Sequence, residues 1–226
     1  MTVTAVVPPV DLSRSRPRPI VEPVPSRLPT PGTTSTALAH APVGQHGLAE
    51  AVLAWQHLRP RGAEAERLAE AMARGATAPA YLPIAYPEND LVATRLVRVL
   101  TGLTWAFVAD GPERPWVGVA RADYHRVGRA LTGTWRRYRR DFTELPATAA
   151  DPTAAVALWR MALLLGNATG GRAFVLHIPV RYAADMLCQA AHTLGVTAAT
   201  DPCPRGRRTV TVCSAADVRR LLTLAI

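Results

Sequence analysis

The 226-residue chain contains no lysine, so all 26 of its basic side chains are arginines. Together with the abundance of alanine, this bias is typical of a GC-rich genome, and the arginine count alone identifies no function. The charge balance says more, because 26 basic and 17 acidic residues leave a formal net charge of +9. Such a field attracts polyanions and is typical of nucleic-acid-binding proteins, with a basic but functionless surface as the alternative.

Cysteine is also scarce, and the short motifs of common active sites are missing. Cys188, Cys203 and Cys213 form no C-x-x-C pair and have no histidines at ligand spacing, which argues against a zinc site or a disulfide framework. No GxxxxGK[ST], GxGxxG, HExxH or GxSxG pattern occurs, which argues against the common nucleotide, protease and hydrolase sites. We therefore expect no metal and no cofactor.

Long hydrophobic runs are absent as well. The first residues carry no positive charge, Pro8 and Pro9 interrupt them, and no later stretch approaches the roughly 18 unbroken apolar residues of a membrane span. These features predict a cytoplasmic protein with no membrane partner. If the protein is bacterial and binds DNA, we expect it at the nucleoid.

What is present falls into a proline-rich start and a longer remainder with regular hydrophobic periodicity. Residues 1–44 contain frequent prolines with no sustained period, so they cannot bury enough apolar area to offset the entropy of ordering. They are predicted to be a disordered tail, loosely basic through Arg14, Arg16, Arg18 and Arg27. A tail of this composition is a candidate for binding a protein partner.

The remainder predicts an α/β (α+β) fold in which one unit occurs twice. Helix, strand, helix, two strands and a closing helix follow one another in residues 45–131, and the succession returns about 93 residues later in residues 152–226. Helices over 63–74 and 154–165 are expected to open the two copies. Two αβαββα units of this kind favour packing about a pseudo-twofold axis.

Arginines cluster at three places outside the predicted core. Residues 132–151 are predicted to link the two units, and they contain Trp135, Arg136, Arg137, Tyr138, Arg139 and Arg140. Two aromatic rings among four arginines can clamp phosphates and stack on bases, or they can form the solvated end of a helix. Candidate phosphate contacts also lie at the two predicted hairpin tips, namely Arg114 in the first unit and Arg205, Arg207 and Arg208 in the second. His177 on a predicted strand is either a functional imidazole or, more often, a residue with a satisfied hydrogen bond.

The second unit resembles a known family. Its sequence Leu158 to Gly170, LWRMALLLGNATG, is followed by a strand, a helix, Leu194-Gly195-Val196 and a hairpin. This succession resembles the degenerate LAGLIDADG unit of the WhiA family of sporulation and cell-division regulators. The resemblance implies a two-unit saddle related to homing endonucleases, with sheets that face DNA and central helices that pack together.

The resemblance also implies that the protein does not cut DNA. In active nucleases each central helix ends in an acid that holds a divalent metal. Aligning residues 162–170 with the nine-residue motif puts Asn167 and Thr169 at the two acidic positions, and the helix end at 72–76 in the first copy also has no acid. The chain departs from WhiA in having no room after the second unit for a helix-turn-helix domain, which puts sequence-specific transcription control in doubt.

Three hypotheses follow from the sequence. The first is a non-catalytic, regulatory DNA-binding protein that contacts double-stranded DNA through the arginines above. The second is a module that binds a transcription or cell-division protein. The third and weakest is an enzyme such as a metal-dependent nuclease.

Overall fold

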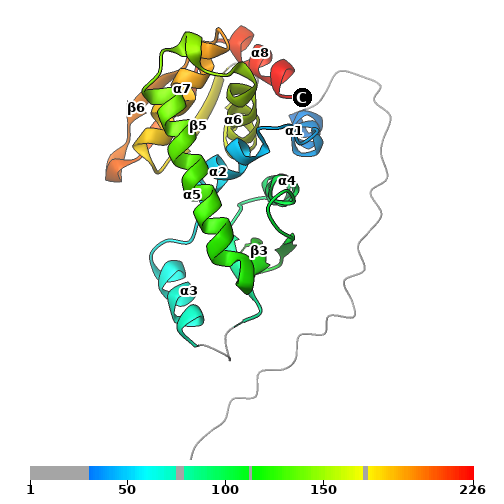
Figure 1. Cartoon of the computed structure of the whole chain (residues 1–226). Coiled ribbons are helices and arrows are strands. Elements are labelled where there is room, and N and C mark those ends of the chain that lie inside the picture. Colours follow the sequence, from blue (N-terminus) through cyan, green and yellow to red (C-terminus); the bar gives the residue numbers. More distant parts are fainter. Residues whose placement is uncertain (1–30, 75–78, 112–113, 170–172) are drawn as a thin grey trace, which may run out of the picture.

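A computed structural model describes residues 31–74, 79–111, 114–169 and 173–226, and Figure 1 shows the arrangement of their helices and strands. The described residues form two structural units of mixed helix and sheet, as the sequence predicts. Residues 1–30, which make up most of the expected disordered tail, lie outside the described part.

The first unit carries a three-stranded antiparallel sheet in the order β1-β3-β2. Its elements, in chain order, are α2 (Gly47–Leu58), α3 (Ala63–Ala73), β1 (Tyr81–Ala85), α4 (Asp90–Leu100), β2 (Ala106–Ala109), β3 (Trp116–Ala120) and α5 (Arg121–Thr143).

The second unit carries a four-stranded antiparallel sheet in the order β4-β5-β7-β6. Its elements are α6 (Pro152–Leu165), β4 (Asn167–Thr169), β5 (Ala173–Ile178), α7 (Arg181–Thr193), β6 (Ala199–Pro202), β7 (Arg208–Val212) and α8 (Ala215–Ala225), with short 3-10 turns at Ala147–Ala149 and Pro204–Gly206. The order β5-β7-β6 repeats the order β1-β3-β2, which is the relation expected of a duplicated unit.

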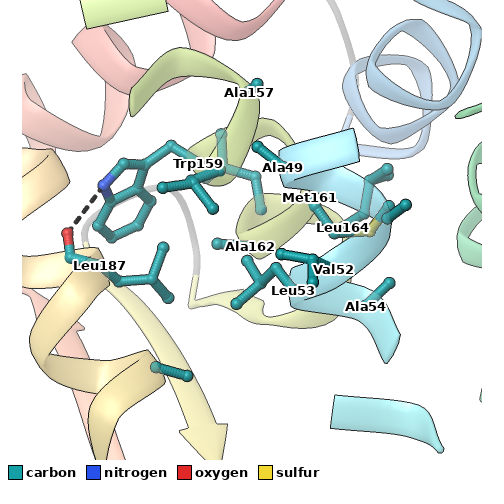
Figure 2. Close-up of a cluster of buried hydrophobic side chains, with 14 of the residues drawn as sticks. Ala49, Val52, Leu53, Ala54, Ala157, Trp159, Met161, Ala162, Leu164 and Leu187 are labelled. Carbon is teal, nitrogen blue, oxygen red and sulfur yellow. Dashed lines mark hydrogen bonds between the residues drawn. The ribbon is translucent and has the colours of Figure 1, made fainter. Parts of the chain in front are cut away.

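The core between the units is built on α2 and α6, which pack directly against each other (Figure 2). Both helices are apolar on nearly every side, a pattern typical of helices buried all round. Alanines such as Ala49 and Ala162 allow close approach, and the fully buried Trp159 donates its indole N–H to the carbonyl of Leu187 at 3.1 Å.

This packing corrects the expected start of the first unit. The sequence prediction made the helix over 63–74 equivalent to the one over 154–165, but α3 buries no residue, and it is α2 that packs on α6. In the second unit β4 directly follows α6, whereas in the first unit α3 occupies that place in the chain. Figure 1 shows α3 set apart from the other helices. The expected order αβαββα therefore omitted β4 from the second unit.

The expected linker over 132–151 is also wrong for most of its length. The helix expected to end at Leu131 continues as α5 to Thr143, and it runs along both units (Figure 1). Val127, Leu131, Tyr138 and Phe142 continue one buried face along it, because spacings of four and seven residues return to the same side of a helix. The two units are thus joined by a packed helix that contacts both α2 and α7.

Order begins earlier than the expected boundary at residue 44. Helix α1 (Pro31–His40) packs on α4 and α6, with Leu38 and Ala39 almost completely buried. Burial of these apolar side chains offsets the ordering entropy that was expected to keep the segment disordered.

Among the described residues, no helix has the length and apolarity needed to cross a membrane. The three cysteines are free, and no group of three potential metal ligands occurs in the described part of the chain.

Candidate nucleic-acid interface

The two central helices run parallel, so their ends meet in pairs. At one end the residue preceding α2, His46, places its Nε2 2.9 Å from Oδ2 of Asp151, the residue that caps α6. His46 Nδ1 also lies 2.8 Å from the hydroxyl of Tyr138 on α5. At the other end, the last turns of both helices open into one shared cavity.

This cavity, of about 350 Å³, is assembled from segments that are far apart in the chain. The ends of α2 and α6, the segment before α4, strand β5 and the β6–β7 connection all contribute. Its polar lining residues are His57, Arg61, Glu88, His177 and Arg207. We call this set the basic pocket.

The charges of the basic pocket favour an anion. Among the described residues, neither Arg61 nor Arg207 forms an ion pair, and Glu88 supplies the single acidic side chain of the lining. The converging carboxyl ends of two helices carry partial negative charge, which stabilises guanidinium groups there. Arg61 is further held by donating to the backbone carbonyl of Gln56. Two guanidinium groups without carboxylate partners are suited to a phosphate.

Burial is the main cause of a lowered pKa for two groups in this pocket. It lowers the pKa of His57, against a smaller raising effect of the Glu88 carboxylate, while Arg61 and Arg207 lower the pKa further. Burial also lowers the pKa of Arg61, helped by Arg59 and Arg207, although a guanidinium remains charged at neutral pH.

The shift of His57 predicts how stability depends on pH. Because its pKa is lower in the folded protein than the ordinary value of about 6.5, the unfolded chain takes up this proton first as the pH falls. The neutral His57 side chain therefore contributes to the free energy of unfolding above about pH 6.5, and this contribution is lost as the pH falls through the pKa of the folded protein. We expect the free energy of unfolding of His57→Gln, measured by urea titration, to decrease less than that of the wild type over this window. Identical decreases in the two proteins would contradict the assignment.

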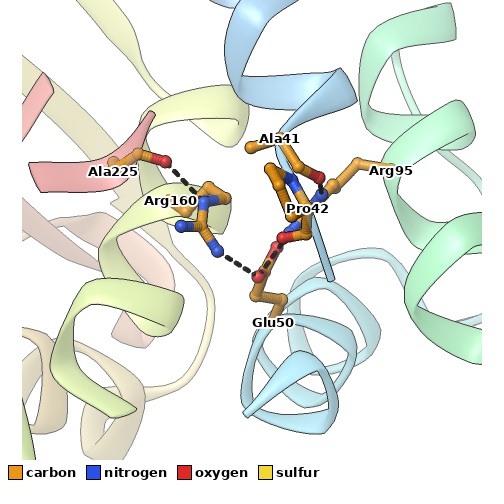
Figure 3. A network of polar contacts seen from close by, with 6 residues as sticks. All are labelled: Ala41, Pro42, Glu50, Arg95, Arg160 and Ala225. Carbon is orange, nitrogen blue, oxygen red and sulfur yellow. Dashed lines mark hydrogen bonds and ion pairs between the residues drawn. The ribbon is translucent and has the colours of Figure 1, made fainter. Parts of the chain in front are cut away.

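A buried ionic network fixes the two units near the other end of the helix pair (Figure 3). Glu50 on α2 accepts hydrogen bonds from Arg95 on α4 at 2.5 and 2.7 Å, and from Arg160 on α6 at 2.9 Å. Arg95 also donates to the carbonyls of Ala41 and Pro42, and Arg160 donates to that of Ala225. One carboxylate thus links the first unit, the second unit and the end of the last helix.

The arginines predicted in the linker lie elsewhere. They project from α5, a helix that packs on α2 and α7, and none lines the basic pocket. Arg137 and Arg140 lie 3.6 and 3.5 Å from the carboxylate of Asp141, and Arg139 lies over the ring of Tyr182.

The two aromatic candidates of that segment are wholly or partly buried. Tyr138 is 5% exposed and hydrogen-bonded to His46, and Trp135 packs partly buried against the core. Of the two interpretations of this segment, the helical one describes its backbone, although the segment belongs to the body of a long helix and not to a free end.

Two candidates at the hairpin tips differ in their surroundings. Arg114 is paired with Glu64 and lies over the ring of Tyr86, whereas Arg207 is exposed and lines the basic pocket. Arg208 begins β7 and pairs in register with Ile178. The side chain of Arg205 lies outside the described part.

The positions aligned with the catalytic acids fall just beyond α6. The helix ends at Leu165, and Asn167 and Thr169 form β4, which pairs with β5. Their side chains lie outside the described part. The last turn of α2, the correct counterpart in the first unit, contains Gln56 and His57 and no acid.

His177 has the hydrogen bond expected of a strand residue, and it also faces a cavity. Its Nδ1 lies 3.1 Å from the Thr209 hydroxyl across the β5–β7 pair, and its exposed side chain lines the basic pocket. Sequence reasoning missed His57, Arg61 and Glu88, which belong to no motif and meet Arg207 and His177 only through the fold.

Several solved structures of other proteins share the fold of this chain. No protein-family model matches the chain, and no curated protein is significantly similar to it. Among solved structures, full-length WhiA (DUF199) of Thermotoga maritima matches 85% of this chain with a TM-score of 0.53 and 10% identity, and the match spans 60% of the WhiA chain. The N-terminal LAGLIDADG domain of WhiA matches with a TM-score of 0.52 and 11% identity over 85% of this chain and 87% of that domain. I-DmoI in complex with DNA and Mn matches with a TM-score of 0.50 and 10% identity, over 80% of this chain and 96% of I-DmoI. The chain therefore has the tandem LAGLIDADG fold of WhiA, which confirms the predicted fold class and resemblance.

Proposed function

We propose that this protein binds double-stranded DNA without cutting it and has a regulatory role. The basic pocket, where both central helices end, would contact the phosphate backbone. The observation that carries the proposal is that Arg61 and Arg207, which form no ion pair within the described part of the chain, lie together where the two units converge.

Three further features support a DNA partner. The formal net charge of +9 favours association with polyanions. The fold is shared with a homing endonuclease whose structure contains DNA. Arg136, Arg137 and Arg140 are exposed on α5 and add further positive charge that could meet a polyanion.

The binding is tested with pure full-length protein and a fluorescently labelled duplex of about 20 base pairs, longer than the site of a compact module. We expect fluorescence anisotropy to show a dissociation constant tighter than about 10⁻⁴ M at physiological salt, the weak edge of non-specific DNA binding. Weaker binding would remove the DNA proposal.

The pocket also predicts the absence of metal-dependent cleavage. Hydrolysis of a phosphodiester by a divalent metal needs oxygen ligands, most effectively several carboxylates. Glu88 is the single carboxylate among the described lining residues. We expect supercoiled plasmid to remain intact in the presence of protein and Mg²⁺ or Mn²⁺. Nicking that disappears in Glu88→Gln would contradict this.

A protein partner remains the second candidate function, and the proline-rich composition of residues 1–30 favours it. Cytoplasmic or nucleoid localisation follows from the DNA proposal and is tested with it.

A further inference from the structure

The open face of the first sheet carries an exposed group of aromatic rings that the proposed duplex contact does not use. Tyr81 on β1, Trp105 before β2, Phe107 on β2 and Trp116 on β3 form this aromatic patch. Trp105 is 64% exposed and Tyr81 41%, which is unusual for side chains of this size.

The rings of the patch form one continuous surface. Trp105 and Phe107 are stacked, with centroids 5.1 Å apart and planes inclined by 25°. Tyr81 meets Phe107 at 5.0 Å and Trp105 at 5.8 Å, and Trp116 meets Phe107 at 5.5 Å. These are favourable aromatic geometries, so the rings hold one another in place while Trp105 stays open to solvent.

A glycine in the middle strand seats two of these rings. Gly118 lies opposite Phe107 in the β2–β3 register, while its neighbours Val117 and Val119 point into the core. A Cβ at Gly118 would lie 2.6 Å from the Phe107 ring and 2.5 Å from the Trp116 ring. The absence of a side chain at Gly118 therefore leaves the space that these two rings occupy.

Arginines accompany the aromatic patch. Trp116 lines a small cavity together with Arg67 and Arg114, and Arg114 lies over the ring of Tyr86. Two arginines, one of them paired with Glu64, thus lie at the Trp116 edge of the aromatic patch.

We propose that the aromatic patch stacks unpaired bases, so that the protein prefers single-stranded or locally opened DNA to a closed duplex. A duplex presents phosphates and base edges to its surroundings, and its base faces are covered by stacking. Unpaired bases expose these faces, and stacking on aromatic side chains is tolerant of sequence. A purely apolar protein partner fits less well, because arginines lie beside the rings. The inference deepens the proposed DNA binding and rests on it for the phosphate contacts.

The test compares two probes on full-length protein. One is an oligothymidine of about 20 nucleotides, longer than the 4–16 nucleotides of a typical single-strand site, and the other is a duplex of equal length. We expect Trp105→Ala to weaken single-strand binding by roughly 5- to 150-fold, the equivalent of one lost stacking interaction, and to change duplex binding by less than about twofold. Trp105→Phe should recover part of the loss.

Leu224→Ala is the control, since Leu224 is a large apolar side chain, 42% exposed on α8, outside the aromatic patch. We expect it to leave both affinities unchanged. Equal loss on both probes in Trp105→Ala, or no loss on either, overturns the inference. If Trp105→Ala changes only self-association in sedimentation, the patch binds protein and the inference is wrong.

The inference and the proposed function fail in different ways. Tight duplex binding that is indifferent to Trp105, with single strands bound no better, overturns the inference alone. Trp105-dependent binding of single strands without measurable duplex binding supports the inference and removes the duplex proposal.

Discussion

Glu50→Gln is expected to lower the free energy of unfolding by about 3–5 kcal/mol, the cost of breaking a buried ion pair from one side. The Arg95 and Glu50 side chains are both 0% exposed, and the same carboxylate accepts from Arg160. Removing the negative charge leaves a fully buried guanidinium without a counter-ion, and water cannot replace it. Urea titration followed by circular dichroism measures the change.

Glu64→Gln provides the control for this prediction. Glu64 pairs with Arg114, and the two side chains are 23% and 39% exposed, so solvent screens their interaction. The free energy of unfolding should therefore fall by less than about 1 kcal/mol. Comparable losses in the two variants would show that the network at Glu50 does not hold the units together. This network joins α2, α4 and α6, and it therefore links the two units through charged side chains.

Replacing Arg61 and Arg207 together by Ala is expected to weaken duplex binding by about 10- to 100-fold at low salt, because each guanidinium makes charge-assisted hydrogen bonds to phosphate. Arg207 is exposed and Arg61 donates to one backbone carbonyl, so the substitutions should leave the fold intact. Fluorescence anisotropy with the labelled duplex gives the affinity, and thermal unfolding checks the fold.

The matched control removes the same charge from α8. Arg219 and Arg220 are exposed on α8, and neither lines the basic pocket. Arg219→Ala with Arg220→Ala should weaken binding by no more than about twofold, the effect of a smaller overall field. An equal loss in both double variants would indicate diffuse attraction.

Much of the fold could be predicted from periodicity and turn residues. The predicted succession of helix, strand, helix, two strands and helix agrees with the structure from β1 to α5 and from β5 to α8. The apolar alternation and flanking glycines or prolines of these elements are local signals, so they survive without tertiary information.

The central helix of the first unit was misassigned for a reason visible in the sequence. Residues 63–73 have one apolar face and many charges, typical of a surface helix, whereas residues 47–58 are apolar nearly all round, like α6. A comparison of the apolar residues around the whole circumference of each helix, and not on one face alone, identifies α2 as the central helix of the first unit. The length of α5 could likewise have been inferred from its buried face, which continues past Gly128 and Gly133 to Phe142.

The basic pocket could not be predicted in this way. His57 and Arg207 lie 150 positions apart, and no spacing rule relates them. Their proximity depends on the parallel packing of α2 and α6, which brings both helix ends to one place. The arginine-rich segment 136–140 was predicted to contact phosphates because its residues are adjacent in sequence. Two of its arginines, however, lie beside Asp141.

The salt dependence of duplex binding tests the central claim, that phosphates are held at the basic pocket, most directly. Each phosphate contact contributes about −0.9 to the slope of log K against log salt. Removing Arg61 and Arg207 should flatten the slope by about 1.8, while replacing Arg136, Arg137, Arg139 and Arg140 together should flatten it by less than about 1. A quadruple variant whose slope falls by about 2–4, beside an unchanged slope in the pocket variant, would contradict the account and place the phosphate contacts on α5.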